Sequence, residues 1–222
     1  IKQGGTSMAR CIMIIMFSIC CSDTIIKSIK EAYNIVEHKY NYDEGLIYFL
    51  HDQFETMPYF MNWCKDCARP EIIDTQTMKK LGDSKTVDRT PELFLSDWVD
   101  DHKRYKYGNQ QFRTFGWCSE YEMSFCAILK AMGYKCKVYQ RGNHVTTRVW
   151  LEHYQLDVDN TFDEIHKIPI NQSYEEWRND LGVGGHKEWY NRVTEESVEV
   201  VKSLETSPYF KARMISYANI AR

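Results

Sequence analysis

In the middle of the chain the spacing of hydrophobic positions changes from a helical period to a strand period. Between residues 118 and 132, hydrophobic side chains recur at intervals of three and four, as on one face of an α-helix. Gly133 follows, and glycine is suited to end a helix. Residues 135–140 then alternate polar with apolar, and residues 144–151 and 154–158 are rich in β-branched and aromatic side chains. This pattern predicts a largely buried helix followed by three antiparallel strands.

Helical patterns also occur on both sides of this segment. The first predicted helix has Ser22 or Asp23 as its cap. Its apolar stripe consists of Ile25, Ile29, Ala32, Tyr33 and Val36. The other predicted helices cover about residues 43–57, a segment that begins at Thr90-Pro91-Glu92, and residues 174–180 and 195–204. Residues 74–89 are polar and lack periodicity, which predicts an exposed loop, and the glycine-rich residues 182–185 predict a flexible connection.

The start of the chain has two interpretations. Residues 1–7 resemble an expression scar or an upstream extension. Met8-Ala9-Arg10 and the apolar residues 11–21 have the charge and length of a signal-peptide core, and this segment is too short to span a bilayer. A buried amino-terminal strand or helix is the other interpretation. With residues 1–7 set aside, we expect a single domain over residues 8–222.

Composition narrows the classes of function. The 222 residues are ample for one hydrophobic core and short for two. A net charge of −3 offers no broad positive surface, so we expect no nucleic-acid partner. Eight cysteines in a chain of this length do not indicate a disulfide framework, which favours a reducing compartment and a cytoplasmic location. If residues 8–21 are a signal peptide, the protein is instead secreted, and Asn171-Gln172-Ser173 becomes a glycosylation sequon.

The central segment carries a candidate nucleophile. Cys118 stands at the predicted start of a helix, a position that lowers the pKa of a thiol and so favours the reactive thiolate. His144 begins the second predicted strand and could act as the base. Asp157 and Asp159 lie on the same face of the third strand, so the two-residue period leaves both eligible to orient the imidazole. Cys126 and Cys136 are expected to be buried, inert thiols.

Four segments together resemble the transglutaminase-like cysteine enzymes, and most closely their peptide N-glycanase branch. These segments are Cys118-Ser119-Glu120-Tyr121, Ala131-Met132-Gly133-Tyr134, His144-Val145 with Val149-Trp150, and Asp159-Asn160-Thr161. The resemblance covers about residues 58–163. It implies an α+β fold with a papain-like core, in which a nucleophile helix packs on an antiparallel sheet and further helices lie at both ends. It also implies a Cys118, His144 and Asp159 triad, and it favours Asp159 over Asp157.

The same resemblance raises the question of metal. That branch binds zinc through two Cys-x-x-Cys pairs, of which Cys64 and Cys67 resemble the first, while the second pair is missing. A structural zinc on Cys64 and Cys67, completed by another cysteine or by a histidine such as His51 or His102, is one interpretation. A local disulfide, a redox pair and a degenerate remnant are the others. Trp63 could donate its indole N–H to an oxyanion or could be a core tryptophan.

These observations predict a cysteine-dependent amide hydrolase that needs no cofactor for its chemistry. The resemblance implies a peptide N-glycanase-like amidase that acts on glycosylated asparagine through a thioester, with a protein or glycoprotein substrate. Trp117 and Ser119 depart from the arginine and glycine usual in that branch, which bears on substrate access. The alternatives are a cysteine peptidase, a protein-glutamine acyl transferase, and a binding or scaffold protein without turnover. The sequence does not define the oligomeric state.

Overall fold

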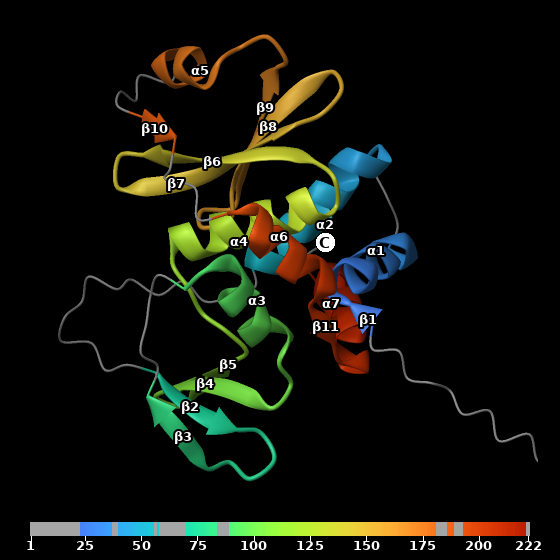
Figure 1. Ribbon diagram of the computed structural model, residues 1–222, viewed down its shortest axis with the longest axis vertical. Coiled ribbons are helices and arrows are strands. Elements are labelled where there is room, and N and C mark those ends of the chain that lie inside the picture. Colours follow the sequence, from blue (N-terminus) through green and yellow to red (C-terminus); the bar gives the residue numbers. More distant parts are fainter. Residues whose placement is uncertain are drawn as a thin grey trace, which may run out of the picture.

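The computed structural model describes residues 23–36, 40–55, 57, 70–83, 89–180, 186–188 and 193–220. These ranges form a mixed α+β fold with antiparallel sheets, which confirms the fold class predicted from the sequence. Helix α4, Cys118–Ala131, lies between the larger sheet and a group of other helices (Figure 1). A smaller sheet lies at the opposite end of the molecule from the larger one.

The larger sheet has five antiparallel strands in the order β10-β6-β7-β8-β9. Their bounds are β6 Lys135–Arg141, β7 His144–Trp150, β8 Tyr154–Asp159, β9 Glu164–Pro169 and β10 His186–Glu188. The helix and three strands predicted in the middle of the chain are therefore confirmed, whereas β9 and β10 were not predicted. Gly133 and Gly142 adopt positive φ angles of 98° and 62°, which suits the end of α4 and the β6–β7 turn.

The remaining helices pack on either side of this unit. Their bounds are α1 Ile25–Ile35, α2 Tyr42–Glu55, α3 Pro91–Val99, α5 Tyr174–Asp180, α6 Glu195–Ser203 and α7 Pro208–Ile220. Helix α5 covers the face of the sheet opposite α4 (Figure 1). Helix α7 was not predicted. A two-stranded ribbon joins β1, Asp23–Thr24, to β11, Glu205–Thr206.

The cap of α1 differs from the prediction. The predicted stripe is correct, since Ile25, Ile29, Ala32 and Tyr33 are buried. The capping residue, however, is Thr24, whose hydroxyl accepts a hydrogen bond from the Lys27 backbone N–H at 3.4 Å. Asp23 pairs with Thr206 in the short ribbon instead.

The smaller sheet contradicts part of the predicted exposed loop over residues 74–89, because residues 80–83 form a strand, while residues 75–79 are a turn as expected and residues 84–88 lie outside the described ranges. Its four strands, in the order β3-β2-β4-β5, are β2 Glu71–Asp74, β3 Lys80–Asp83, β4 Lys103–Tyr107 and β5 Gln110–Phe112. Most of these side chains are half-buried or exposed, so the apolar alternation that normally marks a strand is weak. Backbone pairing, rather than burial of one face, defines this sheet.

Cys126 and Cys136 are buried as predicted, but they are not separate thiols. They form a disulfide between α4 and β6, with Cα atoms 6.0 Å apart. The expectation of two inert free cysteines is therefore wrong. Nothing in the spacing of the two residues distinguished them from the other cysteines, because pairing depends on how α4 meets β6.

Several predictions concern residues outside the described ranges. These are the extension at 1–7, the apolar segment at 8–21, Trp63, Cys64, Cys67 and the glycine-rich residues 182–185. Within the described ranges, no helix combines the length and the apolar character needed to cross a bilayer.

Candidate active site

The lengths of α4 and β6 bring Cys118 and His144 together. The 14 residues of α4 rise about 21 Å, at ~1.5 Å per residue. The 7 residues of β6 return about 23 Å, at ~3.3 Å per residue. The turn at Gly142 then places His144 opposite Arg141, at the same end of the unit as the first residue of α4. The side chains of His144 and Cys118 lie near each other there, since Cys118 is one of the groups that raise the pKa of the imidazole.

Asp159 fixes the orientation of the imidazole. His144 Nε2 lies 2.6 Å from Asp159 Oδ2, so Nδ1 is the ring nitrogen that Asp159 does not engage. The other carboxylate oxygen, Oδ1, accepts hydrogen bonds from the backbone N–H groups of Thr161 at 3.1 Å and Phe162 at 3.2 Å. Both carboxylate oxygens are thus held, so the carboxylate cannot rotate away from the ring.

The electrostatics of the site favour a protonated imidazole. Burial alone would lower the pKa of His144, but the hydrogen bonds and charges of Asp159 and Cys118 outweigh it and raise the pKa from 6.5 to about 9. Cys118 is a free, half-buried cysteine at the first position of a helix. An imidazolium beside such a sulfur is the arrangement that activates cysteine nucleophiles.

The structure distinguishes the two aspartates that the strand period left eligible. Both are buried, each with 1% of its surface exposed. Asp159 bonds to His144, whereas Asp157 Oδ1 accepts a hydrogen bond from Thr146 Oγ1 at 3.1 Å. Asp157 pairs in register with Arg148, deeper in the sheet. Only Asp159 therefore reaches the imidazole.

Glu122, which the sequence analysis did not single out, hydrogen-bonds to the residue that directly follows β8. It lies one helical turn after Cys118 and is fully buried. Its Oε1 accepts the backbone N–H of Asn160 at 2.7 Å, and its Oε2 contacts Thr147 Oγ1 at 2.7 Å and Asn160 Nδ2 at 3.0 Å. Burial, reinforced by the nearby Asp159 charge, raises the pKa of Glu122 well above its usual value. Glu122 thus holds the residue next to Asp159 in place.

His51 extends this buried network. Its Nδ1 lies 2.9 Å from Asn160 Oδ1, and its Nε2 lies 3.1 Å from Asp163 Oδ1. Both ring nitrogens of His51, a residue of α2, are therefore hydrogen-bonded to residues of the turn after β8. The sequence offered two signals for this network. Glu122 is a glutamate within an apolar helix, and Asn160 is a polar residue directly after Asp159.

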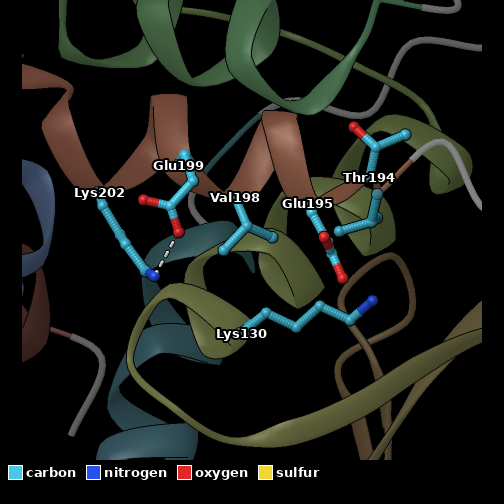
Figure 2. A pocket seen from close by; sticks show the side chains of 7 residues that line it. Lys130, Thr194, Glu195, Val198, Glu199 and Lys202 are labelled. Carbon is cyan, nitrogen blue, oxygen red and sulfur yellow. Dashed lines mark hydrogen bonds and ion pairs between the residues drawn. The ribbon is translucent and has the colours of Figure 1, made fainter.

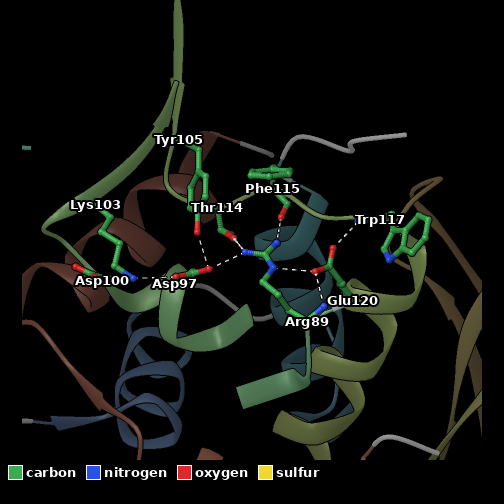
Figure 3. Close-up of polar contacts among 9 residues, drawn as sticks. All are labelled: Arg89, Asp97, Asp100, Lys103, Tyr105, Thr114, Phe115, Trp117 and Glu120. Carbon is green, nitrogen blue, oxygen red and sulfur yellow. Dashed lines mark hydrogen bonds and ion pairs between the residues drawn. The ribbon is translucent and has the colours of Figure 1, made fainter. Parts of the chain in front are cut away.

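Glu120 anchors the turn that leads into the nucleophile. Its Oε1 accepts hydrogen bonds from Arg89 Nε at 2.8 Å and from the Arg89 backbone N–H at 3.1 Å, while its Oε2 accepts the Trp117 backbone N–H at 3.2 Å (Figure 3). Arg89 also donates to Asp97 Oδ2 at 2.7 Å and to the Phe115 carbonyl. Glu120 is thus part of a buried ion-pair network. The role of Arg89 was not anticipated.

Gly116 allows this turn to pack closely. A Cβ atom there would lie 2.8 Å from Phe94 Cε2, 2.8 Å from Tyr121 Cε1 and 3.1 Å from Glu120 Oε2. These distances are too short for any side chain, so glycine is required for the backbone to pass between α3 and α4. The position of Cys118 therefore depends on both the ion pair and the glycine.

Two aromatic residues flank the site. Phe162 is 59% exposed, and its ring centroid lies 4.8 Å from that of His144. Trp117 precedes the nucleophile, and its indole N–H is buried without a hydrogen-bond acceptor among the described residues. Phe162 thus packs beside the imidazole, and Trp117 directly precedes the nucleophile in the chain.

A groove of about 650 Å³ elsewhere on the molecule is not part of this site. It lies between α6 and the end of α4, where Lys130 faces Glu195, Val198 and Lys202 (Figure 2). Lys130 is 12 positions after Cys118, or about 18 Å along the helix. The groove is therefore at the opposite end of α4 from the nucleophile.

Among the described residues, no group of three or more histidine, cysteine, aspartate or glutamate side chains is arranged to hold a metal ion. Cys64 and Cys67, the residues proposed for zinc, are outside those residues. No protein-family model matches the chain, and no relative was found among curated proteins.

Proposed function

We propose that the protein is a cysteine-dependent amide hydrolase with a transglutaminase-like, papain-like core. The observation that carries this proposal is that His144 Nε2 lies 2.6 Å from Asp159 Oδ2, while Cys118 is near enough to the same imidazole to help raise its pKa. A nucleophile, a base and an orienting carboxylate in series form the general arrangement of nucleophilic amide hydrolysis. The position of Cys118 at the start of α4 supports the same role.

The proposed reaction has two steps. The Cys118 thiolate attacks the amide carbonyl, and the C–N bond breaks as the His144 imidazolium gives its proton to the leaving nitrogen. A thioester and a neutral imidazole remain. Neutral His144 then takes a proton from water as the water oxygen attacks the thioester carbon. The C–S bond breaks, which releases the carboxylic acid and restores the Cys118 thiolate beside the His144 imidazolium. Asp159 keeps the ring oriented throughout.

Negative charge on the carbonyl oxygen requires hydrogen-bond donors. The backbone N–H groups at the start of α4 provide partial positive charge beside Cys118. The indole N–H of Trp117, which has no acceptor among the described residues, is a second candidate donor, in addition to that of Trp63. Trp117→Phe would then lower turnover more than substrate binding.

For the substrate we propose the side-chain amide of a glycosylated asparagine in a protein. This choice follows from the resemblance of residues 118–121, 131–134 and 159–161 to the peptide N-glycanase branch. Hydrolysis would leave aspartate in the polypeptide and release the glycan as a glycosylamine. A peptidase, a glutamine acyl transferase and a scaffold without turnover are the competing functions.

Mass spectrometry of a denatured N-glycoprotein and its unglycosylated form, incubated with wild type and Cys118→Ala, tests this function. Loss of glycan with asparagine converted to aspartate, absent with Cys118→Ala, is the expected result. Cleaved backbones or crosslinked glutamines would reassign the enzyme to one of the competing activities. The absence of any Cys118-dependent product, together with slow alkylation of Cys118, would favour the scaffold.

The location of the protein is a separate proposal. A cytoplasmic location was expected from the cysteine content, but the disulfide between Cys126 and Cys136 is of a kind that persists in oxidising compartments. This bond favours the secreted alternative. Asn171, the acceptor of the sequon, is exposed in the turn before α5.

A further inference from the structure

A second, smaller cavity lies between the four-stranded sheet, α3 and α7. Its volume is about 200 Å³. It combines an apolar floor with several cationic side chains, and its principal lining residues are Trp98, Arg104, Phe112, Arg113, Arg213 and Tyr217. These residues come from four separate elements, so only the folded chain brings the three arginines together.

The arginines outnumber the carboxylates that could neutralise them. Asp101 is shared between Arg113, which donates to its Oδ1, and Arg213, whose Nη1 lies 3.6 Å from the same oxygen. The other oxygen of Asp101 accepts a hydrogen bond from Ser207. Among the described residues, no carboxylate lies within ion-pairing distance of Arg104. Asp100, which also attracts Arg104, is paired with Lys103. Among the described residues the cluster therefore has two more positive charges than negative ones.

The hydrogen bonds of these arginines leave donors unused. Arg104 Nη1 donates to the backbone carbonyls of Lys103 at 2.6 Å and Asp101 at 3.5 Å, which carry no net charge. Arg213 Nη2 donates to the Trp98 carbonyl at 3.0 Å, but its Nη1 is buried without a hydrogen-bond partner in the described part of the chain. Burial and the like charges of its neighbours lower the pKa of Arg213 to about 10. In the described part of the chain, the cluster thus has surplus positive charge and one buried donor without an acceptor.

We propose that this cavity binds a phosphate group. A phosphate monoester carries a charge of about −1.5 to −2 near neutral pH, which matches the surplus of two positive charges, and it offers three acceptor oxygens. Guanidinium groups match phosphate oxygens with pairs of N–H donors. The apolar floor of Trp98 and Phe112 would contact whatever body the phosphate is attached to. The site is separate from the Cys118 chemistry and does not depend on the proposed function.

The experiment compares thermal unfolding of the full chain in inorganic phosphate, in O-phosphoserine and in sodium chloride of equal ionic strength, slightly above neutral pH. Phosphate is expected to raise the melting temperature by a few degrees beyond chloride, since a ligand that binds only the folded state stabilises it. An equal response to inorganic phosphate indicates a site for the free ion, whereas a larger response to O-phosphoserine indicates a site for an esterified group. Titration calorimetry with the same two probes then gives the affinities.

Arg104→Gln is the principal variant, because Arg104 bonds only to backbone carbonyls and its loss removes like-charge repulsion. In chloride its melting temperature should equal or exceed that of wild type, while its affinity for phosphate falls about tenfold or more. Arg213→Gln should also lose the phosphate response. Lys202→Gln is the matched control, because it removes one positive charge from an exposed pair with Glu199 and should keep the response.

Two results would overturn the proposal. One is a wild-type protein that phosphate stabilises no more than chloride. The other is an Arg104→Gln variant that is less stable in chloride and responds to phosphate as wild type does, because the arginines would then serve only the fold.

Discussion

His144 Nε2 and Asp159 Oδ2 lie 2.6 Å apart, although the two residues belong to different strands and are 15 positions apart in the chain. Strands β7 and β8 pair antiparallel, so the start of one lies beside the end of the other. The contact sets both the orientation and the charge of the imidazole that faces Cys118. The effects expected for alkylation of Cys118 and for stability in alkaline solution follow from this contact.

Asp159→Asn should slow the alkylation of Cys118 by iodoacetamide at neutral pH by about tenfold or more. The amide removes the negative charge that favours the imidazolium and can present its N–H group to the ring. Asp157→Asn is the matched control, because it changes an equally buried aspartate on the same face of β8 that bonds to Thr146 instead. Equal rates for the two variants would contradict the assignment of Asp159 as the orienting residue.

The stability of the protein should decrease in mildly alkaline solution because of His144. Its pKa is about 9 in the folded protein against 6.5 ordinarily, so its contribution is fully present below pH 6.5 and is lost as the pH rises through 9. This loss should be on the order of 2–3 kcal/mol in the free energy of unfolding. Urea denaturation of wild type and His144→Gln over this pH range measures it. A wild-type profile parallel to that of His144→Gln would show that the pKa is not raised.

Glu122 should tolerate replacement by glutamine but not by alanine. Because the pKa of the buried carboxyl is raised well above its usual value, glutamine resembles its neutral form and should keep the alkylation rate of Cys118 within a few fold. Glu122→Ala leaves the Asn160 N–H without its acceptor and opens a cavity, which should cost about 2–5 kcal/mol of stability and slow alkylation.

Ser124→Ala is the control for this pair, since Ser124 is buried in the same helix and its hydroxyl has no hydrogen-bond partner among the described residues. It should leave both stability and alkylation close to wild type. If Glu122→Gln is as damaging as Glu122→Ala, the carboxyl is ionised and its charge matters.

Arg89→Met should destabilise the protein by about 3–5 kcal/mol, because it leaves Glu120 buried without its cation. Guanidinium chloride denaturation of the variant and wild type measures this difference. Lys80→Met is the control, since Lys80 forms only exposed ion pairs with Glu71 and Asp83 and should change stability by less than about 1 kcal/mol. Similar effects of the two substitutions would contradict the structural role of Arg89.

The disulfide between Cys126 and Cys136 should protect both residues from alkylation in denaturant until a reductant is added, whereas Cys118 reacts without reduction. Peptide mass spectrometry identifies the labelled residues. Reduction should lower stability by about 2–3 kcal/mol, as expected for the short loop that the bond closes. Labelling of Cys126 and Cys136 without reductant would show that the bond does not form in the isolated protein.

The sequence by itself determined the helix that begins at Cys118 and the hairpin that begins the larger sheet. These elements depend on short-range patterns, namely the helical and strand periods and the glycines at 133 and 142, which are complete within the segment. The helix and strand lengths also fix where His144 returns. The candidate nucleophile and base were therefore accessible before the fold was known.

The tertiary structure alone decided between Asp157 and Asp159 on geometry, paired Cys126 with Cys136, and formed the polar four-stranded sheet. It also brought Arg89 to Glu120, Glu122 to Asn160, and the three arginines to one cavity. Each of these contacts joins residues whose own segments carry no signal for the partner. Such contacts depend on the packing of separate elements, and a local pattern of hydrophobic and polar positions cannot specify which elements meet.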